Sequence, residues 1–406
     1  MNKYKILKGK LTQYHQEHLL SFFHQLKPGE QEKLLEQIEG IDLQEMEVAS
    51  RQFTSHRIQQ QAKITPIDYE SMPHLSKTRR KKLEECGLER IKAGKVAVLL
   101  LAGGQGTRLG HDGPKGTVSL GDSSDQSLFA LQAKRLRAVE EKAGAKIPWY
   151  IMTSPSNDDE TKAFFTKNDY FQCDPKQIYF FQQELIPTIT SAGKMILESQ
   201  SEISMAPNGN GGLFSSMKSS GVWDDLQEKE IDWVFLNNID NALVQVADPL
   251  FIGFAEESGA EISSKAVRKR SPDEKVGLLC LANGRPSVVE YSELDAKEVI
   301  DQMLINANMG IHLFHITFLE KAINSSLPYH FAHKVIPLID EYGQHVQVNS
   351  PNGYKLEKFY FDVFPLAEKM SVLQVEREKE FAPVKQKTGE DSLESARKRL
   401  FKNTKA

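Results

Sequence analysis

The sequence predicts an α/β protein built on a Rossmann-like, doubly wound mixed sheet. The first observation is a continuous apolar run at 96–101, which is typical of a strand buried on both faces of a parallel sheet. The second is that strand-like and helical segments alternate along the chain after this run. Further strands are expected at 148–152, 177–181, 233–236 and 311–314, and helices are expected at 129–143 and 161–168.

Three successive segments are expected: a helical N-terminal segment (1–90), a Rossmann-like domain (91–355) and a small charged C-terminal appendage (356–406). In the first segment, apolar residues between 11 and 26 follow a helical rhythm, and Pro28-Gly29 is expected to end that helix. A second helix is expected at 30–38, with Gly40 at its end.

A basic run at 77–82 has two possible interpretations. The first is a patch for targeting or nucleic-acid binding, and the second is the solvated face of a helix. Leucines at helical spacing follow it, which favours the solvated face. The overall charge agrees, because 51 Lys and Arg against 55 Asp and Glu leave −4, without the basic excess of a protein that coats nucleic acid or anionic lipid.

The composition also bears on compartment. The three cysteines lie far apart and form neither metal-ligand spacing nor a disulfide framework. The first residues lack the apolar core of a signal peptide, and the longest apolar run, 96–102, is far too short to span a membrane. The sequence therefore predicts a cytoplasmic protein with neither nucleic acid nor membrane as partner.

The most informative segment begins where the first strand ends, at Leu101-Ala102-Gly103-Gly104, and continues through a glycine-rich stretch to Gly116. Such a turn lies at the carboxyl edge of the sheet, where α/β proteins bind ligands. Glycines let the backbone N–H groups approach a phosphate closely. Arg108 and Lys115 add positive charge to the same loop, which the need for tight packing alone does not explain.

Three kinds of phosphate loop compete for this segment. A dinucleotide fold requires G-x-G-x-x-G, whereas the chain has the looser G-x-G-x-x-x-G from Gly104 to Gly110 and no acidic ribose clamp about twenty residues later. A P-loop requires G-x-x-x-x-G-K-[ST], which is absent. The long basic loop with Pro114-Lys115-Gly116 favours the third kind, a nucleotidyltransferase loop that wraps a nucleoside triphosphate.

The string Leu101-Ala-Gly-Gly-Gln-Gly-Thr-Arg-Leu with Pro114-Lys-Gly resembles the signature of the eukaryotic-type UDP-sugar pyrophosphorylases, most closely the UDP-N-acetylglucosamine pyrophosphorylase branch. The resemblance covers about 95–365. It implies a Rossmann-like nucleotidyltransferase domain, Mg²⁺, and uridylyl transfer from UTP to a sugar 1-phosphate, which yields a UDP-sugar and pyrophosphate. It also assigns nucleotide contacts to Leu101, Ala102, Gly103, Gly104, Gln183, Gly209 and Asn238.

A nucleotide contact and a metal ligand are both assigned to polar residues that follow strands. Gln182 and Gln183 end a strand, where amides suit the edge of a pyrimidine or simply form a polar loop; the resemblance makes Gln183 the residue that reads uracil. Asp240 follows the strand at 233–236. A lone aspartate there is more often a helix N-cap, but Mg²⁺ prefers one or two carboxylates with phosphate oxygens and water. The resemblance to the family's Asp-Asn pair makes Asp240 the metal ligand.

The sugar is expected to meet Asn210, Glu290, Tyr291 and Asn308, again by resemblance. The second glycine loop, 209–212, is of the N-acetylglucosamine type, although Asn208 stands where those enzymes usually carry aspartate. From the residues alone, a tight turn with no role in binding explains this loop as well as a sugar contact does. Asn306-Ala-Asn308 is closer to the glucose enzymes, so the two sugar clues point to different substrates.

The resemblance places Lys355 on the sugar phosphate and the α-phosphate and makes Lys334 a second phosphate contact. The predicted catalysis is positioning and charge neutralisation by Arg108, Lys115 and Lys355, because the attacking phosphate oxygen is already an anion. Three alternatives stay open: the same transfer to glucose 1-phosphate or to both sugars, a non-catalytic UDP-sugar sensor, and a dinucleotide-dependent oxidoreductase.

Overall fold

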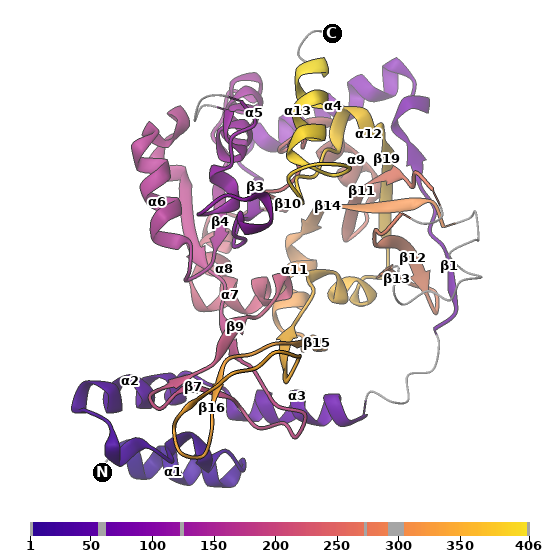
Figure 1. Cartoon of the computed structure of the whole chain (residues 1–406). Helices are drawn as coiled ribbons and strands as arrows, with labels where there is room; N and C mark the ends of the chain where they lie inside the picture. Colours follow the sequence, from indigo (N-terminus) through magenta and orange to yellow (C-terminus); the bar gives the residue numbers. More distant parts are fainter. Residues whose placement is uncertain (1–2, 56–61, 122–125, 272–273, 291–303, 404–406) are drawn as a thin grey trace. The chain divides into compact units, whose positions relative to one another are not determined.

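The computed structural model describes residues 3–55, 62–121, 126–271, 274–290 and 304–403. The chain forms two compact units (Figure 1). The smaller unit comprises Met1–Gln61, Glu184–Gly212 and Ser326–Tyr360, and the larger unit comprises Ala62–Gln183, Leu213–Ser325 and Phe361–Ala406. These units run across the boundaries expected near residues 90 and 355, because each unit is assembled from three stretches that are distant in sequence.

The larger unit contains the expected mixed sheet. Its main strands lie in the order β2 (Glu70–Ser71), β19 (Met370–Val375), β11 (Ile262–Arg268), β14 (Asn306–His315), β10 (Trp233–Asn238), β3 (Val96–Leu101), β4 (Trp149–Thr153) and β5 (Ile178–Gln182). β14 is antiparallel to both of its neighbours, while β10, β3, β4 and β5 are parallel. A side branch joins β1 (Ile64–Pro66), β12 (Leu278–Ala282) and β13 (Arg285–Val289). The fold class and the strands predicted from the sequence are confirmed.

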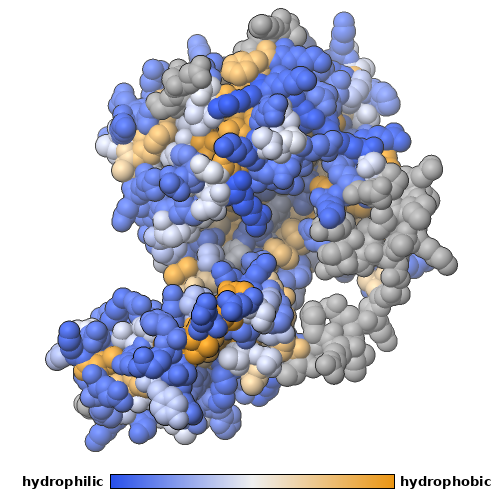
Figure 2. Space-filling model, viewed as in Figure 1, coloured by the Kyte–Doolittle hydropathy of each residue, from blue (hydrophilic) through white to orange (hydrophobic). Residues whose placement is uncertain are grey.

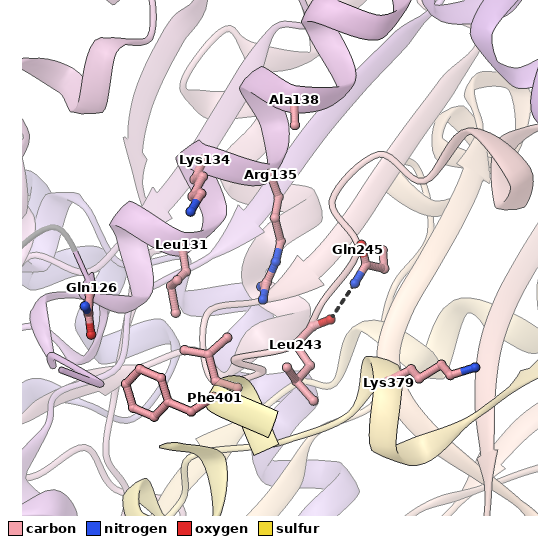
Figure 3. Close-up of a pocket in the computed structure, with 10 residues that line it drawn as sticks. Gln126, Leu131, Lys134, Arg135, Ala138, Leu243, Gln245, Lys379 and Phe401 are labelled. Carbon is pink, nitrogen blue, oxygen red and sulfur yellow. Dashed lines mark hydrogen bonds between the residues drawn. The ribbon is translucent and has the colours of Figure 1, made fainter. Parts of the chain in front are cut away.

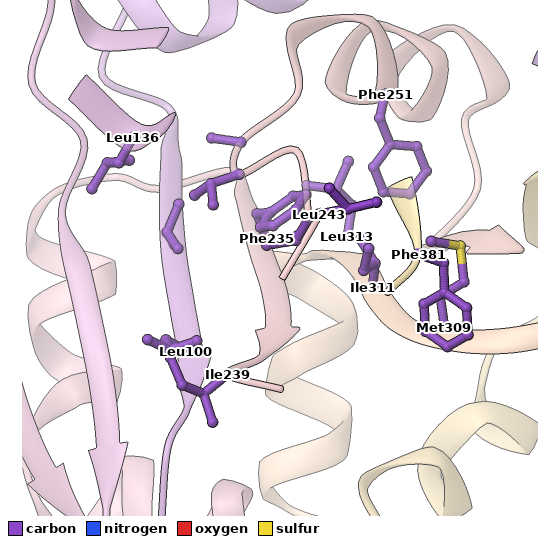
Figure 4. Close-up of a cluster of buried hydrophobic side chains, with 14 of the residues drawn as sticks. Leu100, Leu136, Phe235, Ile239, Leu243, Phe251, Met309, Ile311, Leu313 and Phe381 are labelled. Atoms are coloured by element: carbon purple, nitrogen blue, oxygen red, sulfur yellow. The ribbon is translucent and has the colours of Figure 1, made fainter. Parts of the chain in front are cut away.

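Helices cover both faces of this sheet. One face carries α4 (Lys77–Lys92), α5 (Leu128–Ala143), α6 (Asp158–Lys167) and α9 (Pro249–Ser258), and the other carries α7 (Leu213–Ser219), α8 (Val222–Glu228) and α11 (Ile316–Ile323). Alternate residues of a strand point to opposite faces. Figure 4 shows Phe235 and Leu313, from two adjacent strands, near Phe251 of α9, and Leu100 of the next strand beside Ile239. On the opposite face, the hydroxyl of Tyr150 donates to Asp225 of α8.

The C-terminal part of the chain and the basic run at 77–82 both belong to the larger unit. β19 lies inside the sheet between β2 and β11, so residues 370–375 form part of the core rather than an appendage. Two short helices follow it, α12 (Arg377–Glu380) and α13 (Leu393–Asn403). The basic run at 77–82 forms the first turns of α4, which Ser76 caps by accepting from the Arg79 N–H. Among the described helices, none is long and apolar enough to cross a membrane.

The smaller unit combines three helices with short hairpins. The helices are α1 (Lys3–Gln13), α2 (Pro28–Glu39) and α3 (Leu43–Ser55). The hairpins pair β6 (Leu185–Pro187) with β9 (Met205–Pro207), β7 (Leu197–Ser199) with β8 (Glu202–Ile203), β15 (His330–Lys334) with β18 (Gly353–Glu357), and β16 (Leu338–Ile339) with β17 (His345–Val346). Its own hydrophobic core includes Leu11, Leu34, Ile189 and Leu356.

The expectation that Pro28-Gly29 ends a helix is wrong. Pro28 is the first residue of α2, since proline lacks an N–H and fits the first turn of a helix, where that group has no intrahelical partner. α1 ends earlier, at Gln13, and 3-10 turns occupy Glu17–Leu20 and Phe23–Gln25. The helix expected at 30–38 is present within α2, and Gly40 caps its end as expected.

Candidate functional site

The glycine-rich loop after β3 is folded back on itself at the carboxyl edge of the sheet. The Lys115 N–H donates to the Gly104 carbonyl at 3.0 Å, and the Gly106 N–H donates to the Gly113 carbonyl at 2.9 Å. Asn157, which is buried, supports the loop by donating to the Ala102 carbonyl at 3.1 Å. Within the described ranges, the N–H groups of Gly103 and Gly104 have no acceptor. Two backbone donors are therefore available to an anionic ligand.

Lys115 and Asp240 meet at this edge. Lys115 begins a 3-10 turn, Lys115–Thr117, and Asp240 lies two residues beyond β10. β3 and β10 are parallel neighbours in which Leu101 pairs with Asn238, so the two strands deliver their following residues to the same place. The Lys115 Nζ lies 3.7 Å from the Asp240 Oδ2, with 17% and 26% of the side chains exposed. Both charged groups can therefore still reach a ligand.

A magnesium ion is compatible with Asp240. Mg²⁺ prefers one or two carboxylates, with phosphate oxygens and water completing its shell, and does not require a cage of protein ligands. Asp240 offers one partly exposed carboxylate. No cluster of three or more His, Cys, Asp or Glu side chains suited to a metal occurs in the part of the chain that the structure describes. The donor set thus fits a cation held jointly with a phosphorylated ligand.

The other predicted nucleotide residues of the larger unit gather at the same sheet edge. Gln183 follows β5, and its backbone N–H donates to the Thr153 carbonyl at 2.9 Å. Its side-chain amide lies against Gly103, where a Cβ atom would stand 3.1 Å from the amide carbon. Asn238 ends β10 opposite Leu101. Arg108 is exposed in the turn Thr107–Leu109 and has no ion-pair partner among the described residues.

Two predicted sugar residues also come together in the larger unit. Glu290 follows β13, and a Cβ atom on Gly277 would stand 2.9 Å from its Oε1. The Asn308 N–H donates to the carbonyl of the same Gly277 at 2.8 Å. The Asn308 side chain accepts from the Gly310 N–H at 2.9 Å, which fixes its orientation. Tyr291 lies outside the described residues.

The second glycine loop belongs to the smaller unit, where it packs on the segment that follows β18. The Gly211 N–H donates to the Lys358 carbonyl at 2.7 Å, and the Lys358 N–H donates to the Asn208 carbonyl at 3.0 Å. Gly209 has a φ of +73°, and a Cβ atom there would stand 2.4 Å from the Lys358 carbonyl oxygen. The side-chain carbonyl of Asn210 accepts from the Tyr360 N–H at 3.0 Å.

Lys334 and Lys355 lie on one face of the β15–β18 hairpin. Lys334 pairs with Gly353, and Ala332 pairs with Lys355, so the two lysines are diagonal neighbours on the same side. The opposite side carries Phe331 and Tyr354, whose rings pack on Phe53. The apolar side faces the interior of the smaller unit, which leaves the two lysines on its outer side.

Two residues that the sequence analysis did not select support the site. Asn157 holds the first glycine loop, as described above. Asn241, which is 2% exposed, follows Asp240, and its side chain donates to the Glu380 carbonyl at 2.8 Å and accepts from the Ala382 N–H at 2.9 Å. For Asn157 a polar residue after a strand was the available signal. For Asn241 no local signal indicates this supporting role, because Glu380 and Ala382 lie 139 and 141 residues away in sequence.

Comparison with known proteins adds to this geometry. The model of the family described as UTP–glucose-1-phosphate uridylyltransferase matches residues 43–404. A probable UDP-N-acetylglucosamine pyrophosphorylase from Dictyostelium discoideum is 39% identical over 397 residues, 91% of this chain and 81% of the relative. UDP-N-acetylhexosamine pyrophosphorylase-like protein 1 from Homo sapiens is 37% identical over 422 residues, 97% of this chain and 83% of the relative. The crystal structure of uridine diphosphate N-acetylglucosamine pyrophosphorylase from Trypanosoma brucei, in complex with an inhibitor, superposes with a TM-score of 0.86 at 31% identity, covering 99% of this chain and 85% of that one.

Proposed function

Because the chain belongs to the UTP–glucose-1-phosphate uridylyltransferase family, we propose that it transfers uridylyl from UTP to N-acetylglucosamine 1-phosphate. The products are UDP-N-acetylglucosamine and pyrophosphate. The choice of sugar is supported by the names of relatives that are 37–39% identical over most of the chain. It is also supported by the glycine loop at 209–212, which resembles the corresponding loop of the N-acetylglucosamine enzymes.

The observation that carries the transfer reaction is the meeting of Lys115 and Asp240 in the loop region of Gly103 and Gly104, whose N–H groups have no acceptor among the described residues. Cationic and N–H donors stabilise phosphate oxygens, and a carboxylate among them is suited to a cation bound by the same phosphates. Arg108 adds a second, exposed charge to this loop. A sensor of UDP-sugar would need neither the carboxylate nor this concentration of charge.

In the proposed mechanism, an oxygen of the sugar phosphate attacks the α-phosphorus of UTP in line. The new phosphorus–oxygen bond forms as the bond to the bridging oxygen of the β-phosphate breaks, and pyrophosphate leaves with the electron pair. The nucleophile is already an anion, so no proton has to be removed. What the protein supplies is orientation and neutralisation of charge.

We assign the roles as follows. Lys115 and Arg108 neutralise the triphosphate and the leaving pyrophosphate, and Lys355 and Lys334 bind phosphate oxygens. Asp240 holds Mg²⁺, which would neutralise charge on the phosphate oxygens when bound. Gln183 reads uracil, with further nucleotide contacts from Leu101–Gly104, Gly209 and Asn238. Asn210, Glu290, Tyr291 and Asn308 contact the sugar. A cytoplasmic location remains a prediction.

Pyrophosphate release from UTP and Mg²⁺ tests this proposal, with N-acetylglucosamine 1-phosphate and glucose 1-phosphate compared at equal concentrations. We expect higher kcat/KM with the acetylated sugar. A preference for glucose 1-phosphate would show that Asn306-Ala-Asn308, rather than the loop at 209–212, reports the sugar pocket. Release with neither sugar, nor with galactose 1-phosphate, would contradict the proposed reaction.

A further inference from the structure

A cavity of about 450 Å³ opens on the larger unit, and none of its lining residues is assigned to UTP or the sugar (Figure 3). α5 forms one wall with Leu131, Lys134, Arg135 and Ala138. The loop after β10 contributes Leu243, and α13 contributes Phe401. The cavity therefore lies between α5, α13 and the loop after β10, which also carries Asp240.

Much of the cavity wall is apolar. Leu131, Leu243 and Phe401 line it, and Phe401 keeps 45% of its surface exposed. Figure 2 shows hydrophobic residues at the surface of the larger unit near the C-terminal end of the chain, surrounded by hydrophilic ones. Ligand pockets are typically concave and mostly apolar, with a few polar groups that fix the orientation of the ligand. An apolar wall alone would bind many apolar ligands, so the charged groups that line the cavity determine which class of ligand it prefers.

Two cations of α5 line this cavity, and neither has a counter-charge among the described residues. The Arg135 guanidinium donates from Nη2 to the Ala242 carbonyl at 2.7 Å, whereas its Nη1 is buried and has no hydrogen-bond partner within the described ranges. Burial lowers the pKa of this guanidinium to about 10, which still leaves it charged at neutral pH. Lys134 is exposed and has no ion-pair partner in the part of the chain described.

Acidic groups do not balance these charges. Among the described residues that line the cavity, none is an aspartate or a glutamate. Lys379 also lines it, but its ammonium group pairs with Glu376. A buried donor without an acceptor costs free energy, and an anion that accepts from it would recover that cost.

We propose that this cavity binds a small organic anion. Its phosphate, sulfonate or carboxylate group lies at Lys134 and Arg135, and its apolar ring or chain lies against Leu131, Leu243 and Phe401. A guanidinium suits such an oxyanion because it can donate two parallel hydrogen bonds. The same guanidinium holds the carbonyl of Ala242, two residues after Asp240, so the bound anion shares a contact with the loop that carries the proposed metal ligand.

Two fluorescent probes of nearly the same shape test the proposal on the full chain. 8-Anilinonaphthalene-1-sulfonate carries the anion, and N-phenyl-1-naphthylamine lacks it. We expect the sulfonate to bind at one saturable site and at least about tenfold more tightly than the neutral probe, as an added charge-assisted contact implies. Equal affinity for the two probes would overturn the anionic character of the site.

Variants locate the site. Lys134→Gln should weaken binding of the sulfonate several-fold with little effect on the neutral probe, and Ala138→Trp, which fills the cavity, should weaken both. Lys398→Gln, on the exposed side of α13, is the matched control and should change the binding of neither probe.

Sulfonate binding that is unchanged by Lys134→Gln and Ala138→Trp, or that Mg²⁺ and UTP displace, would place the probe elsewhere and overturn the proposal. Pyrophosphate release by Lys134→Gln should equal that of the unmodified chain, so this result is independent of the proposed reaction.

Discussion

The side-chain carbonyl of Asn241 accepts a hydrogen bond from the backbone N–H of Ala382 at 2.9 Å. The same side chain donates to the Glu380 carbonyl, while the Val384 N–H donates to the Asp240 carbonyl at 2.8 Å. The segment 380–384 thus runs beside the loop 240–242 and fixes its backbone. Both β10 and this distant segment position Asp240 near Lys115.

Replacing Asn241 should displace Asp240 without touching a ligand directly. Asn241→Ala removes three hydrogen bonds from a buried site, so we expect about 1–3 kcal/mol lower stability and a fall in kcat of about tenfold or more. The Mg²⁺ concentration required for half-maximal rate should rise, while the KM for UTP should change less. Urea unfolding and Mg²⁺ titrations of the rate measure both effects.

Asn168→Ala is the control for this variant. Asn168 is partly buried and donates to the Phe164 carbonyl at 2.8 Å, but it lies at the end of α6, away from Asp240. It should lower stability modestly and leave the Mg²⁺ requirement unchanged. An Asn241→Ala enzyme with the ordinary Mg²⁺ requirement would show that segment 380–384 does not position Asp240.

Removing the charge of Lys115 should slow the reaction strongly. We expect Lys115→Ala to reduce turnover by about 10²–10³-fold, because charge on the leaving pyrophosphate would lose its neutralising partner. Steady-state pyrophosphate release measures the effect. Lys176→Ala, at an exposed turn, is the control and should behave as the unmodified chain. Nearly normal turnover by Lys115→Ala would remove the first glycine loop from the mechanism.

Asp240→Asn tests the metal assignment with the shape of the side chain kept. Binding of Mn²⁺ in the presence of UTP, followed by electron paramagnetic resonance, should weaken by about tenfold or more because the charged ligand is lost. The rate of pyrophosphate release should fall in parallel. Unchanged Mn²⁺ affinity in the UTP complex would assign the metal to other groups.

Gly209→Ala should disturb the second glycine loop for two reasons. The φ of +73° is unfavourable for alanine, and the new Cβ atom would clash with the Lys358 carbonyl oxygen at 2.4 Å. We expect a loss of about 1–3 kcal/mol in stability together with a raised KM for substrate. Gly94→Ala, with a φ of +71° and open space around it, isolates the cost of the backbone angle and should cost less.

The buried His312 should make stability depend on pH. Burial lowers its pKa to about 3, against about 6.5 in the unfolded chain. Below pH 6.5 the unfolded state therefore binds a proton that the folded state does not, and stability falls as pH decreases from 6.5 towards 3. The slope from this residue is at most about 1.4 kcal/mol per pH unit. Urea unfolding at pH 7 and pH 5 should show a smaller difference for His312→Gln than for the unmodified chain.

The sequence predicted those elements whose signal is local. The run at 96–101 and the alternation after it were sufficient for β3, β4, β5 and β10 and for the helices α5 and α6, whereas α7 and α8 were not predicted. The first glycine loop and Asp240 were recognised as strand-end features. Their meeting follows from the parallel pairing of β3 with β10, which brings their carboxyl ends to one edge.

What the sequence could not predict depends on contacts between distant residues. The place of β19 inside the sheet is set by its pairing with β11, more than a hundred residues earlier, which no local pattern encodes. The partners of Asn241 and the packing of Gly209 on Lys358 are of the same kind. Pro28 was misread for another reason, since proline can either end a helix or begin one.

The position of β19 in the sheet has a consequence for how the protein matures. This strand is synthesised after every other strand of the sheet, yet it lies between β2 and β11, and the segment that fixes Asp240 comes later still. A ribosome-bound chain that ends before residue 384 therefore carries the glycine loop and Asp240 but lacks the backbone partner of Asp240. We therefore expect Asp240 to be fixed in place only after these residues have left the exit tunnel, however early β3 and β10 fold.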